Sequence, residues 1–282
     1  MAATADIGKQ FADLINGGRE SLRAGEAEEA LVQFDGAVKI LPIAGMAHFD
    51  RGTALHQLEQ PERAELAFSI AISLHSEDEV ARTYAYLNRS AAREDQGNVA
   101  GALADLERAS NDERAPDVAE RTQVLRSQRD LDDSWQANES QRIRDLLRQG
   151  ISLQTSHPLV ALALLTEVSE RIPPAAPVFQ ALGVANTTLR RTRQALQHFQ
   201  TVLSLQGDPS CLRAEALFNC GSLLEGEGRH EEALNSYREC LKLCQMDDVD
   251  FPPLGHPASE GILRRLQTRI EALSNVHEVT RR

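Results

Sequence analysis

Aromatic residues are scarce in this chain of 282 residues, where they fill 4% of the positions. Helix-breaking residues are also few, with 11 prolines and 17 glycines. Most of the remaining positions hold Ala, Leu, Glu, Gln or Arg, which favour helices. With 41% hydrophobic and 26% charged residues, the composition is that of a folded soluble protein rather than of a disordered one. We therefore expect an all-helical protein, built as one extended domain or two compact ones.

A surplus of basic residues is missing too. The 30 Lys and Arg residues face 42 Asp and Glu residues, which gives a formal net charge of −12. Phosphate backbones and anionic lipids repel such a chain unless it carries a local basic patch. The short Arg-rich stretches at residues 142–144 and 190–193 are typical of solvated helix faces. We expect no nucleic-acid partner and no membrane partner.

Long apolar runs are absent as well. The longest covers residues 159–165, far short of the roughly 18 residues that cross a bilayer. Residues 1–6 have neither the basic start nor the apolar core of a signal peptide. The four cysteines form no C-x-x-C pair, which fits a reducing compartment where thiols stay free. These features predict a cytoplasmic protein.

Sequence motifs of catalysis do not occur. There is no Gly-rich phosphate loop, no H-E-x-x-H and no G-x-S-x-G. The eight histidines are scattered, and none has a Ser or Cys nucleophile at a spacing that would bring the two together. We expect a protein that is not an enzyme and that needs no cofactor.

The late cysteines offer one candidate metal site. Cys240 and Cys244 are one helical turn apart, and His230 is close to them in sequence. Without a C-x-x-C pair, this spacing is weak evidence for zinc. Cys240 and Cys220 also stand where the repeat described next places small or apolar side chains, so we interpret them as small hydrophobic residues. No metal is predicted.

A phrase of small and aromatic residues near the N-terminus is the strongest signal in the sequence. Gly25 is followed by Ala30, then by Phe34 four residues later, by Ala37 three further on, and by Pro42. These residues match every element in the second half of the tetratricopeptide repeat motif, which the segment resembles. The resemblance implies an antiparallel pair of helices, with Gly at the turn between them and Pro after the second.

The phrase returns along the chain with a period of about 34 residues, which is the length of this repeat. Six copies cover residues 11–113 and 142–246, and the fourth is degenerate. Small residues let two helix backbones approach closely, and the aromatic fills the wedge between successive pairs. One pair cannot bury its apolar face alone, so the pairs must stack. The later copies comprise Gly52, Ala64, Phe68 and Ala71; Gly97, Ala102, Leu106 and Ala109; Ala161, Leu165, Val168 and Pro173; Leu182, Gly183, Ala195, Phe199 and Val202; and Gly221, Gly228, Ala233, Tyr237 and Cys240.

The resemblance implies an all-α fold, a TPR α-solenoid in which antiparallel helix pairs form a right-handed superhelix with a C-terminal capping helix. We predict an N-terminal array of three repeats over residues 1–113 and a helical connector over 114–141. A C-terminal array of three repeats follows over 142–246, and then a loop, the capping helix and a tail over 247–282. In the connector, Asp117 and Glu120 have the spacing of a capping box, and we interpret Trp135 as a packing residue. The capping helix should span about residues 260–275, with an apolar stripe of Leu263, Leu266, Ile270 and Leu273.

In this family the first helix of each pair lines an inner groove, and the resemblance places specific residues on it. The sixth position of that helix holds Asn16, Asp50, Asn88 and Asn219. Asn carries both a donor and an acceptor, so such a row resembles the asparagine ladders of peptide-binding members. The alternative is that Asn is merely tolerated at a solvated position.

Other inward positions would supply specificity. Phe49, Tyr84 and Phe218 would present aromatic surface, where binding hot spots concentrate. Arg19 and Arg23 would make the first pair basic, whereas the next stretch would be acidic through Asp50, Glu94 and Asp95. The fourth copy would offer leucines, which predict a covered groove or an apolar partner segment. They are Leu146, Leu147 and Leu153, next to Ile143.

One subset of the family, the co-factors of heat-shock chaperones, grips a C-terminal carboxylate with Lys, Asn and Arg residues spread over three repeats. Asn88 matches the middle repeat of that clamp. Phe49 and Thr53 in the preceding copy, and Ile143 and Leu147 in the following one, occupy places where the clamp needs Lys, Asn or Arg. A carboxylate clamp is therefore not predicted.

These observations favour a non-catalytic adaptor or scaffold that binds a peptide or helix of a protein partner in its groove. The alternative is self-assembly into homo-oligomers, because repeat arrays can stack through incompletely capped ends. A more remote alternative is an α-solenoid that reads RNA, which the acidic charge balance opposes. The fold alone does not name the partner.

Overall fold

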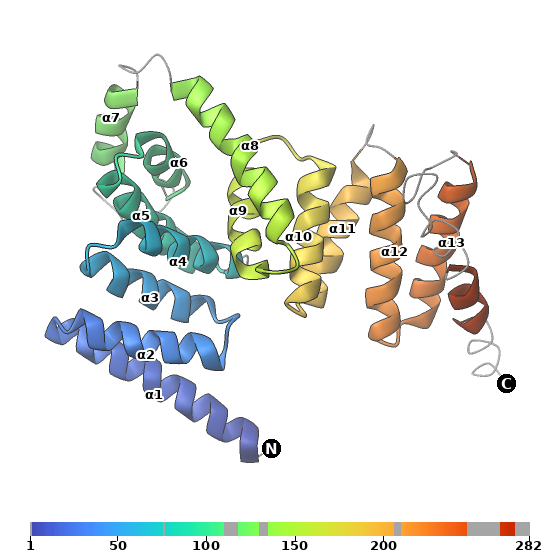
Figure 1. The fold of residues 1–282 in the computed structure, drawn as a ribbon, viewed down its shortest axis with the longest axis horizontal. Helices are drawn as coiled ribbons and strands as arrows, with labels where there is room; N and C mark the ends of the chain where they lie inside the picture. The colour runs from blue at the N-terminus through green and yellow to red at the C-terminus, as the bar shows by residue number, and fades with distance from the viewer. Residues whose placement is uncertain are drawn as a thin grey trace. The chain divides into compact units, whose positions relative to one another are not determined.

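The computed structural model describes residues 2–75, 77–109, 118–129, 135–205, 210–246 and 266–273. Within these ranges no residue lies in a strand, and almost all are helical (Figure 1). The predicted all-α fold is confirmed. The helices are α1 (Ala2–Ala24), α2 (Ala27–Ile40), α3 (Gly45–Gln57), α4 (Pro61–Leu74), α5 (Glu79–Asp95), α6 (Val99–Ala109), α7 (Val118–Arg129), α8 (Trp135–Leu153), α9 (Pro158–Arg171), α10 (Ala176–Thr188), α11 (Thr192–Ser204), α12 (Ser210–Gly226) and α13 (His230–Met246); residues 266–273 form a further helix.

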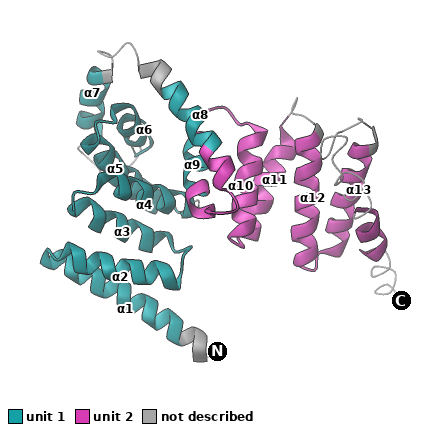
Figure 2. Ribbon diagram, viewed as in Figure 1, with its two compact units in different colours: residues 1–148, 162–167 teal, residues 149–161, 168–282 magenta. Residues whose placement is uncertain are grey.

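The chain divides into two compact units (Figure 2). Unit 1 consists of residues 1–148 and 162–167, and unit 2 of residues 149–161 and 168–282. Helix α8 begins at Trp135, ahead of residue 142, where we place the start of the fourth repeat. Asp117, Leu263 and the loop predicted over 247–259 lie outside the described residues. The division into two arrays with a connector stays a prediction.

Unit 1 stacks its first helices in sequence order. Helices α1 and α2, α3 and α4, and α5 and α6 pack as pairs, and each pair also contacts the next along the chain. Helix α7 then packs on α6 through Val118 and Leu125, which are buried with Leu106. Every consecutive pair therefore closes the apolar face that the preceding pair leaves open.

One contact between a glycine and an aromatic ring recurs in both units. Atoms of the Phe34 ring lie 2.5 Å from where a Cβ on Gly18 would stand, and the same distance from Gly52 to Phe68 is 2.7 Å. Gly183 with Phe199 and Gly221 with Tyr237 repeat it in unit 2, at 2.4 and 2.6 Å. In each case the ring fills the space that a side chain would need, so the first helix requires glycine there. The sequence interpretation assigned this role to the later glycines but did not include Gly18.

In five of the six copies the turn inside the helix pair uses a left-handed residue five positions before the alanine of the second helix; the degenerate fourth copy, with Ser156 at that position, does not. Gly25, Gly97 and Gly228 have φ of 81°, 70° and 76° there, as the motif predicts. In the second and fifth copies Glu59 and Arg190 adopt the same backbone, with φ of 54° and 56°. The geometry of the repeat thus holds these two residues in a backbone conformation that glycine adopts more easily.

Unit 2 ends in the expected cap. The pairs α10 with α11 and α12 with α13 pack around Phe199 and Tyr237, both fully buried. Leu266 and Leu273 of the helix at 266–273 are buried in the same cluster. Arg269 of this helix forms an ion pair with Glu225 of α12. The last described helix therefore covers the apolar face of the final pair.

Candidate partner-binding face

The first helices of the pairs in unit 1 lie next to one another, because α3 contacts both α1 and α5. Arg19 Nη2 of α1 lies 2.9 Å from Asp50 Oδ2 of α3. On the other side of α3, His56 Nε2 lies 2.7 Å from Asp95 Oδ2 of α5. Two of the predicted site residues, Arg19 and Asp50, are thus brought together across adjacent helices.

These contacts change the charge pattern that the sequence suggested. Burial raises the pKa of Asp50, and the guanidinium of Arg19 opposes that shift. Glu94 forms an ion pair with Arg121 of α7. The predicted contrast between a basic first helix and an acidic next stretch is therefore reduced by internal pairing. Arg23 is exposed at the end of α1.

Two of the three predicted aromatic contributors pack partly into the core. Phe49 is half-buried, and its ring lies 5.7 Å from that of Phe68 with an interplanar angle of 58°. Phe218 in unit 2 repeats this arrangement with Tyr237, at 5.9 Å and 53°. Each pair joins equivalent positions of its repeat, so Phe49 and Phe218 both support the packing of their helix pair.

Tyr84 is the predicted aromatic residue that remains open to solvent, with 45% of its surface exposed. Asn88, one turn later on α5, is half-buried and donates from Nδ2 to the Tyr84 carbonyl oxygen at 2.8 Å. Met46 at the start of α3 is 42% exposed. Asn16 on α1 is exposed, and Leu146 on α8 and Asn219 on α12 are half-buried.

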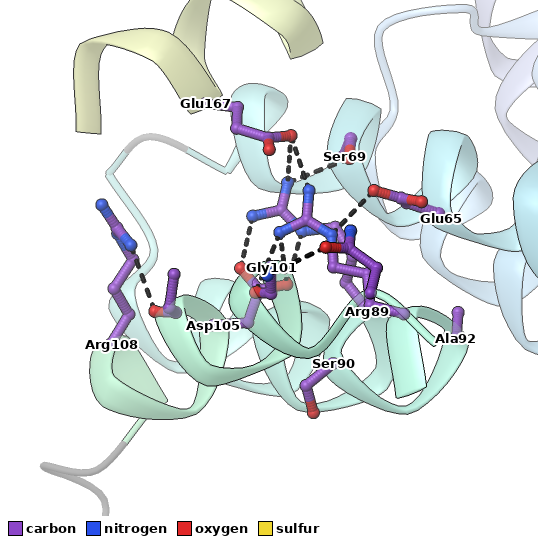
Figure 3. A network of polar contacts seen from close by, with 12 residues as sticks. Glu65, Ser69, Arg89, Ser90, Ala92, Gly101, Asp105, Arg108 and Glu167 are labelled. Carbon is purple, nitrogen blue, oxygen red and sulfur yellow. Dashed lines mark hydrogen bonds and ion pairs between the residues drawn. The ribbon is translucent and has the colours of Figure 1, made fainter. Parts of the chain in front are cut away.

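The structure also contains a buried ionic cluster that sequence reasoning missed (Figure 3). Arg89 of α5 binds Asp105 of α6 with two parallel hydrogen bonds, Nε to Oδ2 at 2.9 Å and Nη2 to Oδ1 at 2.6 Å. Its Nη1 donates to Ser69 Oγ of α4 at 2.9 Å. Both Arg89 and Asp105 are almost fully buried, and such bidentate pairs are the strong ones.

Arg93, one turn further along α5, is the centre of the same cluster. It donates from Nε to Glu65 at 2.7 Å, from Nη1 to Asp105 at 2.9 Å, and from Nη2 to Glu167 of α9 at 2.6 Å. Burial and the neighbouring Arg89 lower its pKa, but Asp105, Glu167 and Glu65 raise it more, and the net pKa is raised. Arg93 therefore stays charged inside unit 1. Arg142 of α8 completes the cluster through Glu65 and Glu167.

A signal for this cluster was present in the repeat alignment. Glu65 stands one residue after the alanine of the second helix, at a position that is leucine in the other five copies. A carboxylate at a buried position requires a cationic partner, and Arg93 supplies it. The five leucines are Leu31, Leu103, Leu162, Leu196 and Leu234.

The cysteines of unit 2 are free thiols. Burial raises the pKa of Cys220 to about 11, and Cys240 donates from Sγ to the Ala214 carbonyl oxygen at 3.2 Å. Both positions serve packing in the described structure. Among the described residues, no group of three or more His, Cys, Asp and Glu side chains is placed to hold a metal ion.

The geometry defines the class of protein: a repeat protein of stacked antiparallel helix pairs, four of which pack a glycine of the first helix against an aromatic ring of the second. Models of the family described as tetratricopeptide repeat match residues 16–79 and 214–245. The chain is a tetratricopeptide repeat protein. Repeats of this family generally mediate interactions between proteins and are typically not catalytic.

Several solved structures are similar to the chain. One is a complex of the TPR2AB domain of yeast Sti1 with pHSP90, at 14% identity and a TM-score of 0.39, covering 95% of this chain and 99% of that one. A second is MamA from Desulfovibrio magneticus RS-1, at 16% identity and a TM-score of 0.33, covering 86% and 99%. A third is YrrB, described as a TPR protein with an unusual peptide-binding site, at 17% identity and a TM-score of 0.31, covering 83% and 86%. No curated protein sequence matches the chain.

Proposed function

We propose that this protein is a non-catalytic adaptor that binds a peptide or helix of a partner protein along the first helices of its repeats. The observation that carries the proposal is the exposure of Tyr84 beside Asn88 on α5. Burying a tyrosine ring under a partner contributes a large share of the binding free energy of an interface. Asn88 adds an amide that can bond to a partner backbone. Asn16 and Met46 extend the same set of helices with a polar and an apolar side chain.

An affinity capture with the full chain tests this proposal. The double variant Tyr84→Ser with Asn88→Ala should recover at least five times less of the bound proteins than the wild type. The matched control is Val124→Ser on α7, because Val124 is 51% exposed but is not on a first helix. Equal recovery by all three proteins would contradict the proposal that partners bind along the first helices.

A cytoplasmic location is part of the proposal. It is supported by the four free thiols, which persist in a reducing compartment. No described helix combines the length and the apolar character that crossing a membrane requires. The acidic charge balance supports a protein partner rather than a nucleic acid.

Self-association is the second candidate, and one observation favours it. Val32 of α2 is 70% exposed, and packing against a second copy would remove this apolar side chain from water. Light scattering over a range of concentrations separates the two functions. A mass that stays at one chain supports the adaptor, and a mass that rises with concentration supports self-association.

A further inference from the structure

The first helices of unit 2 carry a polar pair, Gln180 and Glu215, that forms no ion pair with another described residue. Helices α10 and α12 contact each other directly. Gln180 of α10 donates from Nε2 to Glu215 Oε2 of α12 at 3.2 Å. Both residues stand at inward positions of their helices in the predicted groove, the fifth in copy five and the second in copy six.

Gln180 leaves one acceptor unused. Only 7% of its surface is exposed, and its Oε1 has no hydrogen-bond partner among the described residues. The amide orientation is fixed by chemistry, because a carboxylate only accepts and the nitrogen must therefore face Glu215. A buried acceptor without a donor is unfavourable. The oxygen thus marks a place where a donor is missing.

Glu215 is a carboxylate with no cationic partner among the described residues. It is half-buried, and burial raises its pKa while the hydrogen bond from Gln180 opposes the shift. Two other carboxylates at inward positions, Asp50 and Glu225, have Arg19 and Arg269 as partners. No described basic side chain forms an ion pair with Glu215. Within the described part of the chain, the site therefore combines a carboxylate that has no cationic partner with a neighbouring acceptor that has no donor.

The surroundings suit a long side chain with a charged end. Phe218 and Asn219 follow Glu215 by three and four residues on α12, so they lie on the same helix face. Phe218 is half-buried, with its ring 5.9 Å from that of Tyr237. An aromatic ring attracts both the methylene stem and the charge of a cationic side chain.

We propose that Glu215 and Gln180 form a binding site for the guanidinium group of an arginine in the partner segment. The guanidinium donates in a planar fork: one N–H bonds to the Glu215 carboxylate, and another bonds to Gln180 Oε1, which is buried in the free protein, once the Gln180 side chain turns toward the partner. An ammonium is a compact point charge, so it matches two separate acceptors less well than a guanidinium does. The inference rests on the proposed function, because it names the partner side chain that unit 2 takes.

A titration with small probes tests the site alone. Backbone amide shifts of residues 180 and 215 in the full chain are followed by NMR while N-acetyl-arginine amide is added. The uncharged isostere N-acetyl-citrulline amide is the matched probe, and N-acetyl-lysine amide tests the shape of the cation. The expected order of affinity is arginine first, lysine at least threefold weaker, and citrulline at least tenfold weaker. Equal affinity for arginine and citrulline would overturn the site, and equal affinity for arginine and lysine would overturn its guanidinium preference.

Two variants separate the site from the general attraction of an acidic protein. Glu215→Gln should weaken arginine binding about tenfold, which is the effect of about 1.4 kcal/mol. Glu239→Gln removes the same charge from an exposed position on α13 and should change the affinity less than twofold. Equal weakening by both would show attraction to net charge only. Failure here with a successful affinity capture removes only the arginine site, whereas success here with a failed capture removes the face at Tyr84 and Asn88.

Discussion

Arg93 and Glu167 are 74 residues apart in sequence, and their Nη2 and Oε2 atoms meet at 2.6 Å inside unit 1. Arg93 is fully buried, and Glu167 nearly so. Three arginines and three carboxylates share this cluster, so its formal charges cancel. Ionic hydrogen bonds thereby join Arg93 of α5 to Glu167 and to Glu65, and Glu65 stands at the position that is leucine in the other copies of the repeat.

Removing one carboxylate from this cluster should destabilise unit 1. Glu167→Ala leaves Arg93 with less compensation in a buried place, and such losses cost about 3–5 kcal/mol. Glu239→Ala on the exposed side of α13 should cost less than about 0.5 kcal/mol. Chemical denaturation of both variants checks this. A loss in Glu167→Ala no larger than in the control would mean that the cluster does not stabilise the fold.

The glycines under the aromatic rings should not tolerate a methyl group. In Gly52→Ala the new Cβ would lie 2.7 Å from the Phe68 ring, and overpacking of this kind costs about 1–3 kcal/mol. Gly8→Ala in α1 is the matched control, because nothing lies within 4 Å of its Cβ. Alanine favours helix by up to about 1 kcal/mol there. Thermal melts should therefore shift down for Gly52→Ala and up for Gly8→Ala, and shifts of the same sign would contradict the role of the ring contact.

The left-handed turn residues offer a substitution that should stabilise the protein. Glu59→Gly relieves a backbone conformation that costs an ordinary residue about 1 kcal/mol or more. Part of the gain is offset by the greater freedom of glycine in the unfolded chain. We expect a net increase of about 0.5 kcal/mol. Glu62→Gly, in the first turn of α4, should instead lower stability by about 1 kcal/mol. Denaturation midpoints that fall in both variants would contradict the strain at Glu59.

His198 should make stability depend on pH. Burial lowers its pKa to about 4, with a smaller contribution from Arg191. Because the pKa in the unfolded chain is about 6.5, the unfolded state binds the proton first as the pH falls. The contribution of His198 to the free energy of unfolding is therefore full above pH 6.5. It decreases toward pH 4, by at most about 1.4 kcal/mol per pH unit.

Comparing variants isolates that contribution from other titrating groups. The slope of unfolding free energy against pH between 6.5 and 4 should be shallower in His198→Gln than in the wild type. His157→Gln, at an exposed position, should keep the wild-type slope. A slope that is the same in all three proteins would show that His198 titrates normally in the folded state.

Most of the fold could be predicted because the residues that define the repeat motif are close together in the sequence. Phe34, Phe68, Phe199 and Tyr237 recur at a fixed spacing from a small residue, and each is buried where the motif places it. The spacing reports contacts within a helix pair, which span few residues. The left-handed backbone at Glu59 was not predicted, because the sequence there carries no glycine.

The candidate site was less accessible to sequence reasoning for a physical reason. Contacts between repeats depend on which side chains meet across helices, and the motif does not specify them. Arg19 was expected to make the groove of the first pair basic, and the structure pairs it with Asp50. Phe49 was assigned to a binding surface, and its ring packs against Phe68. Helix periodicity gives the face on which a residue lies, but not the partner that it finds there.

Site-specific photo-cross-linking in the native cell tests the central claim most directly. A photoreactive phenylalanine analogue is placed singly at Met46 or Tyr84 on the first helices, and at Val32 or Val124 elsewhere on unit 1. All four side chains are at least 42% exposed, so the positions are comparable in access. The account predicts cross-links to one and the same partner segment from Met46 and Tyr84, and far fewer from the other two. Cross-links mainly from Val32 and Val124, or from all four positions equally, would contradict it.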